Sequence, residues 1–257
     1  MKKPIIDVVI PAFNEAENIA IVLGDIPAFW VRDVVVCDNN STDETASCAQ
    51  AAGATVVFEP TAGYGIACLK ALDFIKNKAE KPDIVVFLDG DYSDDPRQLV
   101  DLIAPILGKT VKEMADFEAN FAKNADLYWG GGKNAPIELV IGSRVRGNLA
   151  AGALTIPQRF GNWLATTLIR LIFGLRFSDL GPFRAITFEA LERIKMEDKN
   201  FGWTVEMQIK AAKFKLRTTE IAVDYRRRHA GVSKVSGSIK GAFKAGYIIL
   251  YTIFKYS

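Results

Sequence analysis

Residues 85–96 read VVFLDGDYSDDP, an apolar run that leads directly into four aspartates. The run at 84–88 is rich in β-branched residues and has polar neighbours, which predicts a short buried strand. The aspartates that follow it are Asp89, Asp91, Asp94 and Asp95. So much negative charge at the end of a buried strand indicates a positive partner at that edge of a sheet.

Four further β-branched runs, bounded by turn or polar residues, alternate with helix-like segments; they lie at 5–10, 34–37, 55–58 and 139–141. Asn14-x-x-Glu17 and Ser41-x-x-Glu44 resemble capping boxes, and Gly53 is expected to end the second helix. Alternating strands and helices predict right-handed crossovers and an α/β fold with a mostly parallel central sheet flanked by helices. Ligands of such sheets bind at the carboxyl ends of the strands.

The composition is that of a globular protein in which carboxylates would have to bind any metal. The chain has 257 residues, of which 49% are apolar and 24% charged, and we expect one domain over 1–257. We interpret 108–136 as an insertion, helical over 111–126. His229 is the sequence's only histidine, which argues against histidine-rich metal sites and a Ser-His-Asp triad. The three cysteines lack metal-ligand spacing and indicate reduced thiols of a cytosolic protein.

The C-terminal part of the chain is basic. Residues 201–257 hold 11 Lys and Arg against 3 Asp and Glu, although the whole chain carries a net charge of only +2. This predicts an anionic ligand or a membrane surface near 226–257, with a solvated helix face as the alternative. The segment FGNWLATTLIRLIF at 160–173 fits either a membrane surface or a core helix. We expect no signal peptide, no membrane-spanning helix and no nucleic-acid partner.

Asp89 and Asp91 have the spacing of a metal site. Two residues apart on an extended segment, they would lie ~7 Å apart and repel by about 2.4 kcal/mol at an effective dielectric near 20. A divalent cation removes that repulsion, and oxygen ligands favour Mg²⁺ or Mn²⁺ completed by substrate phosphates. The alternative is an acidic turn. For Asp94 and Asp95 we prefer helix capping, because Asp95 precedes Pro96.

A second polar cluster follows the first two predicted strands. The carboxylate of Asp38, and Asn14 with Glu15 from the neighbouring loop, can accept hydrogen bonds from a nucleobase N–H or a ribose hydroxyl. Capping is the favoured role for the side chains of Asn14 and Ser41. Neither the G-x-G-x-x-G turn of nicotinamide-binding proteins nor a P-loop occurs, so the pattern favours a nucleoside diphosphate held through a metal.

Several motifs together resemble family 2 glycosyltransferases with the nucleotide-diphosphosugar transferase (GT-A) fold. They are VIPAFNEAENI, DNNSTDET, GYGIA, FLDGDYSDDP, IGSR, DLGPFRAI and YRRRHAGVSK. The resemblance spans nearly the whole chain apart from 108–136, and the nearest branch is that of the dolichyl- or polyprenyl-phosphate mannose and glucose synthases. It implies inverting, metal-dependent transfer from a UDP- or GDP-hexose to a polyprenyl phosphate, at the inner face of the cytoplasmic membrane.

The resemblance also implies roles for individual residues. The nucleoside would be held by Pro11, Ala12, Asn14, Glu15 and Asp38. Asp89 and Asp91 would hold ribose, diphosphate and metal, with Gly65 and Gly90 in the same donor site. Arg144, Arg228, Ser233 and Lys234 match positions that contact phosphates. Ser93 stands where this branch often has Gln, which removes a direct third metal ligand.

Asp179 and Glu206 are the candidate carboxylates on the acceptor side. A hydroxyl acceptor needs one of them as a general base, whereas a phosphate acceptor needs orientation more than deprotonation. The alternatives are a structural pair of Asp179 with Arg184 and a helix-dipole role for Glu206. Transfer to a soluble or glycan hydroxyl, or nucleotide-sugar binding without turnover, remain the rival functions.

Overall fold

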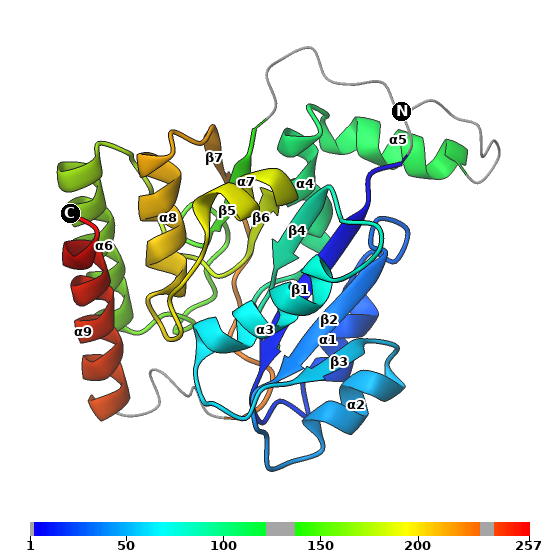
Figure 1. Cartoon of the computed structure of the whole chain (residues 1–257), viewed down its shortest axis with the longest axis horizontal. Helices are drawn as coiled ribbons and strands as arrows, with labels where there is room; N and C mark the ends of the chain where they lie inside the picture. The colour runs from blue at the N-terminus through cyan, green and yellow to red at the C-terminus, as the bar shows by residue number, and fades with distance from the viewer. Residues whose placement is uncertain (1–2, 122–136, 232–238) are drawn as a thin grey trace.

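A seven-stranded sheet runs through the centre of the computed structural model, which describes residues 3–121, 137–231 and 239–257 (Figure 1). The strand order is β3-β2-β1-β4-β6-β5-β7, and only β6 runs antiparallel to its neighbours. The strands are β1 (Ile6–Ala12), β2 (Asp33–Asp38), β3 (Thr55–Phe58), β4 (Ile84–Phe87), β5 (Leu139–Ser143), β6 (Arg184–Thr187) and β7 (Thr218–Ala222). The mostly parallel α/β sheet predicted from the sequence is confirmed.

Helices cover both faces of the sheet, so its central strands are apolar on both sides. One face packs against α3 (Tyr64–Lys76), α6 (Ile156–Phe173), α7 (Phe188–Ile194), α8 (Trp203–Lys213) and α9 (Ile239–Lys255). The other packs against α1 (Ile19–Asp25), α2 (Thr45–Ala51), α4 (Leu99–Ile106) and α5 (Val111–Phe121). Within β4, Val85 and Phe87 face the first layer and Val86 faces the second, each fully buried.

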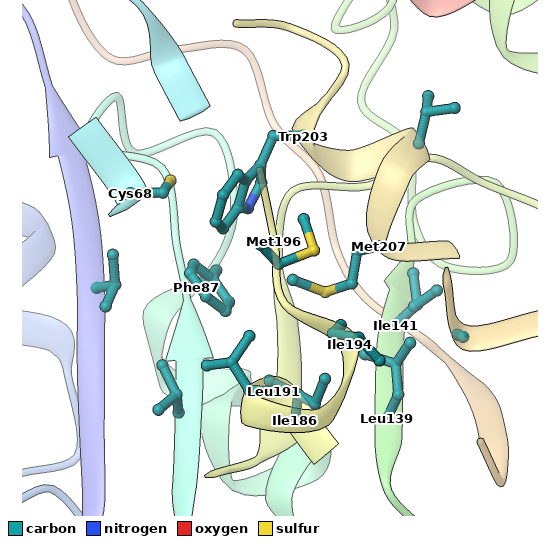
Figure 2. Packing of buried hydrophobic residues seen from close by; sticks show 14 of the residues in the cluster. Cys68, Phe87, Leu139, Ile141, Ile186, Leu191, Ile194, Met196, Trp203 and Met207 are labelled. Carbon is teal, nitrogen blue, oxygen red and sulfur yellow. The ribbon is translucent and has the colours of Figure 1, made fainter. Parts of the chain in front are cut away.

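The core beneath the end of β4 is aromatic. Figure 2 shows Trp203 of α8 beside Phe87, with Cys68 of α3 close by. The two rings meet edge to face, with centroids 5.8 Å apart. Because Phe87 is the last residue of β4, this packing fixes the point from which the acidic loop departs.

The capping predictions are partly wrong. Neither Asn14 nor Ser41 caps a helix, since α1 begins only at Ile19 and α2 at Thr45. Gly53 adopts a positive φ of 90° just after α2, which confirms it as the stop of that helix.

Of the two aspartates that were predicted to cap a helix, one caps the turn that follows and the other does not. Asp95 accepts a hydrogen bond from the backbone N–H of Arg97 and caps the short 3₁₀ turn at Pro96–Gln98, as predicted. Asp94 caps nothing, so that part of the prediction is wrong.

At one end of the sheet, α6, α8 and α9 pack together (Figure 1). The segment 160–173 is both a core helix and a surface helix, because Ala165 and Ile169 are buried while Phe160 and Trp163 are exposed. None of the helices within the described ranges combines the length and apolar character of a membrane span.

Candidate functional site

The loop after β4 places two carboxylates at the edge where the parallel strands end. Asp89 accepts a hydrogen bond of 2.9 Å from the hydroxyl of Tyr64, the first residue of α3. Burial, followed by the negative charge of Asp91, raises the pKa of Asp89 to about 7. A raised pKa means that the ionised form of the carboxyl group is destabilised, and a nearby cation would stabilise that form.

Arg228 is the cation that lies closest to this pair. Its Nη2 donates to Oδ2 of Asp91 and to Oε1 of Glu15, both at 2.9 Å. Glu15 is buried and is held by Asn18 through a 2.6 Å hydrogen bond. One guanidinium therefore joins the loops after β1 and β4 across the carboxyl edge of the sheet.

The residues present fit a metal that substrate phosphates help to bind. Within the described parts of the chain, no three His, Cys, Asp or Glu side chains are grouped so as to hold an ion by themselves. Asp89 and Asp91 are the candidate ligands, and Asp89 is only partly ionised near neutral pH. Mg²⁺ and Mn²⁺ are commonly held by one or two carboxylates plus phosphate oxygens, which matches this donor set.

The loops after β1 and β2 are tied together by side chains. Asn14, at a positive φ of 53°, donates its backbone N–H to Ser41 Oγ at 3.0 Å, and its side-chain oxygen accepts from the backbone N–H of Thr42 at 2.8 Å. Asp38 is buried and accepts from the backbone N–H of Ser41. Asn14 and Ser41 thus fix the two loops that carry Glu15 and Asp38.

Gly65 is explained by close backbone packing. A Cβ at Gly65 would lie 2.0 Å from the carbonyl oxygen of Asp198, and the N–H of Gly65 donates to the carbonyl of Asn200 at 3.2 Å. This contact seats the start of α3, and with it the Tyr64 hydroxyl that holds Asp89. A Cβ at Gly90 would have more room, since the nearest atom, Cγ2 of Ile10, would lie 3.4 Å away.

Arg144 and Asp179 form a buried ion pair beside the cluster. The Nε and Nη2 atoms of Arg144 each donate to Asp179 at 2.7 Å, and the Arg144 backbone N–H donates at 2.8 Å. Asp179 is fully buried, and Nη1 of Arg144 donates no hydrogen bond within the described residues. The alternative pairing with Arg184 is wrong, because that guanidinium donates to backbone carbonyls only.

Glu206, one of the two candidate carboxylates on the acceptor side, lies in a network of buried hydrogen bonds. Its fully buried carboxylate accepts from Lys210 Nζ at 2.8 Å, from the Tyr256 hydroxyl at 2.7 Å and from the backbone N–H groups of Glu197 and Asp198. Although burial opposes it, these donors lower the pKa of Glu206. A carboxylate with four donors ties α9 to α8 and has no lone pair to spare for catalysis.

Sequence patterns missed two features of the site. Tyr64 lies in the GYGIA motif, but the pattern gives its hydroxyl no partner, and Asp94 was read as a cap. Asp94 is 1% exposed and neither of its carboxylate oxygens has a hydrogen-bond partner among the described residues. Ser233 and Lys234, predicted to contact phosphates, lie outside the described residues.

Comparison with protein families identifies this arrangement. The model of the family described as glycosyl transferase family 2 matches residues 7–194, which include β1 to β6 and the acidic loop. The chain belongs to glycosyl transferase family 2. As a member of that family it is a glycosyltransferase that uses a nucleotide-sugar donor.

Curated relatives of this glycosyltransferase cover nearly the same length. An uncharacterized glycosyltransferase of Mycobacterium tuberculosis is 33% identical over 242 residues, which are 93% of this chain and 94% of the relative. An undecaprenyl-phosphate mannosyltransferase of Micrococcus luteus is 27% identical over 243 residues, which are 91% of this chain and 88% of that enzyme.

Among solved structures, this family 2 glycosyltransferase resembles glucosyl-3-phosphoglycerate synthase of Mycobacterium tuberculosis in complex with Mn²⁺, UDP and glucosyl-3-phosphoglycerate. The TM-score is 0.70 at 21% sequence identity, over 98% of this chain and 80% of that one. At this identity the likeness concerns the fold, which is the GT-A fold expected from the sequence.

Proposed function

We propose that this glycosyltransferase transfers a hexose, with inversion and with Mg²⁺ or Mn²⁺, from UDP- or GDP-hexose to a polyprenyl phosphate. The observation that carries the donor half of the proposal is the group formed by Asp89, Asp91, Arg228 and Glu15 at the carboxyl edge of the sheet. Two carboxylates beside a guanidinium suit a metal diphosphate, because the metal can replace Arg228 at Asp91 and the phosphates can replace Asp91 at Arg228.

In the proposed complex, each residue has a separate task on the donor. Asp89 and Asp91 would hold the metal, which stabilises the charge that develops on the departing nucleoside diphosphate. Asp38, at the end of β2, would accept hydrogen bonds from the nucleoside. Arg228 would move from Asp91 to a phosphate oxygen, where a guanidinium binds bidentately.

The buried pair of Arg144 and Asp179 favours a phosphate acceptor. Asp179 accepts three hydrogen bonds from Arg144, so it would have to lose them to act as a base. A phosphate monoester has a second pKa near 6 and is already nucleophilic at neutral pH. Arg144, oriented by Asp179, would use its remaining Nη1 to position that phosphate.

The surface of α6 and α9 favours a lipid acceptor. Seven apolar or aromatic side chains of these helices are between 57% and 82% exposed: Ile156, Phe160, Trp163, Leu171, Tyr247, Tyr251 and Phe254. Ile156, Phe160 and Trp163 of α6, and all three of α9, recur three or four residues apart, and Leu171 follows Trp163 by eight. Exposed Arg159 and Arg170 lie beside those of α6. Aromatic side chains with flanking arginines suit the interface of a membrane that contains the lipid phosphate.

The acceptor is tested by supplying labelled UDP-glucose and GDP-mannose with Mn²⁺ and one acceptor at a time. We expect labelled product with undecaprenyl phosphate in vesicles and none with 3-phosphoglycerate or a sugar alcohol. Trp163→Ser with Leu171→Ser should lower transfer to vesicles several-fold and leave donor hydrolysis unchanged, whereas Val111→Ser on exposed α5 should do neither. Product with 3-phosphoglycerate alone would contradict the lipid acceptor.

Replacing Arg228 should shift metal and donor affinity in opposite directions. Without a nucleotide, Arg228→Met removes a cation that competes for Asp91, so Mn²⁺ should bind about five- to tenfold more tightly. With the nucleoside diphosphate present, the lost phosphate contact should weaken binding by roughly tenfold. Titration calorimetry of Mn²⁺, and then of UDP or GDP with Mn²⁺, measures both.

Arg227→Met is the matched control for this reversal. Arg227 is exposed and its Nε donates to the carbonyl of Ala151, away from the carboxylates. Arg227→Met should change the affinities for Mn²⁺ and for the nucleoside diphosphate by no more than about twofold. Weaker Mn²⁺ binding by Arg228→Met would show that the guanidinium does not compete with the metal.

A further inference from the structure

Asp94 is a buried carboxyl group that the residues described so far leave without a role. Neither oxygen has a hydrogen-bond partner within the described residues, and the side chain is almost completely removed from solvent. Burial, followed by the negative charge of Asp89, raises the pKa of Asp94 well above its usual range. Buried polar groups without partners are rare in folded proteins, and one beside a binding site can find its partner in a ligand.

The fold itself does not need this carboxyl group. The cap of the following turn is supplied by Asp95, and the contact that fixes the backbone of Asp94 is a bridge to the backbone of Tyr225. An apolar or amide side chain would keep that bridge. Asp94 is also no part of a three-residue metal group within the described residues.

Asp94 lies among the groups that surround the proposed diphosphate. It belongs to the acidic loop, three residues after Asp91, and its backbone is bridged to Tyr225, whose ring centroid lies 5.1 Å from the guanidinium carbon of Arg144. In a nucleotide sugar the hexose is attached to the second phosphate. A group near both the metal-binding carboxylates and the acceptor-side ion pair is therefore suited to hold the hexose.

The segment that covers Asp94 is joined to the group that the donor must displace. Residues 225–229 run along the acidic loop: the N–H of Arg226 donates to the carbonyl of Ser93 at 2.9 Å, and Arg228 binds Asp91. When Arg228 transfers to the diphosphate, one of the ties of this segment is released. In the proposed complex this would give a hydroxyl group of the sugar access to Asp94.

We propose that Asp94 accepts hydrogen bonds from hydroxyl groups of the donor hexose and thereby contributes to the choice of sugar; this rests on the proposed donor site. Hydroxyl groups are the donors that a hexose offers, and a carboxylate can accept from two neighbouring hydroxyls. A buried site built to pair with a substrate hydroxyl discriminates strongly, since an analogue without it leaves the protein group unpaired.

The test compares the affinities of a nucleoside diphosphate and of its hexose conjugate, each with Mn²⁺: UDP with UDP-glucose, and GDP with GDP-mannose. In Asp94→Asn and Asp94→Ser, the conjugate that binds the wild type should bind at least tenfold more weakly, while the nucleoside diphosphate binds as before. In transfer assays the same variants should raise KM for the donor and lose their preference among hexoses.

A stability measurement separates this role from a structural one. Asp94→Asn should not lower Tm, because the carboxyl group that it replaces makes no hydrogen bond within the described residues. The control is Asp7→Asn, which removes an equally buried aspartate paired with Arg32 and Lys78 at the opposite edge of the sheet, and should lower Tm without changing relative donor affinity.

Two results would overturn the proposal in distinguishable ways. If the wild type binds neither nucleoside diphosphate with Mn²⁺, the donor site fails and the role of Asp94 fails with it. If the wild type binds one of them but Asp94→Asn changes both affinities equally, or neither, the donor site stands and Asp94 is not a sugar-binding residue.

Discussion

Asp91→Asn is expected to lower the transfer rate by roughly 10³-fold, because the variant loses one of the two carboxylates that hold the metal against the diphosphate. The same substitution should abolish the Mn²⁺-dependent part of UDP or GDP affinity. The folded state should survive, since Glu15 still pairs with Arg228 at 2.9 Å. Initial rates and titration calorimetry, with circular dichroism as a check on folding, measure the three effects.

Asp95→Asn is the matched control for Asp91→Asn, because it makes the same change of charge four residues away. Asp95 caps the turn at Pro96–Gln98 and pairs with Arg97 and Arg226. Asp95→Asn should lower the free energy of unfolding by about 1 kcal/mol and leave Mn²⁺-dependent nucleotide binding in place. Wild-type transfer by Asp91→Asn would rule out the metal role.

Arg144→Met should produce the largest loss of stability. It leaves Asp179, which is fully buried, as a charge without its partner, and this typically costs about 3–5 kcal/mol. For a chain of this size we expect Tm to fall by roughly 10 °C. Arg146→Met, two residues along, removes an exposed arginine paired with Glu220 and should change stability by no more than ~1 kcal/mol.

The double variant Arg144→Met with Asp179→Leu separates structure from chemistry. Replacing a whole buried ion pair by apolar residues is often neutral, so most of the stability should return. Transfer should stay low, since the guanidinium that positions the acceptor phosphate is still missing. Recovery of both stability and transfer would show that the pair is only structural.

The fold could be predicted from the sequence because its buried strands have a continuous apolar pattern. The five runs identified there correspond to β1 through β5. The two remaining strands lack this signal: β6 is four residues long and begins with Arg184, while β7 is an edge strand with the polar start Thr218-Thr219. The antiparallel position of β6 depends on its pairing with β4, so the local periodicity of the sequence does not reveal it.

The candidate site was predictable in composition but not in its pairings. The spacing of Asp89 and Asp91 after a strand predicts that they lie at the sheet's carboxyl edge. The bond from Tyr64 to Asp89 spans 25 residues and the one from Arg228 to Asp91 spans 137, so no local pattern could reveal them.

Glu206 shows the same limit of sequence reasoning. Its place near the start of a helix made it a candidate catalytic carboxylate, with a helix-dipole role as the alternative. Only the fold brings Tyr256, fifty residues later, and the backbone of Glu197 and Asp198 onto its oxygens.

The most direct test is a crystal structure with Mn²⁺ and the nucleoside diphosphate that binds, recorded with anomalous diffraction at the manganese edge. The account predicts one strong anomalous peak, with oxygens of Asp91 and of the diphosphate within about 2.5 Å and Arg228 turned from Asp91 to a phosphate. A bound nucleotide with no manganese at Asp91, and with Arg228 still on that carboxylate, would contradict it.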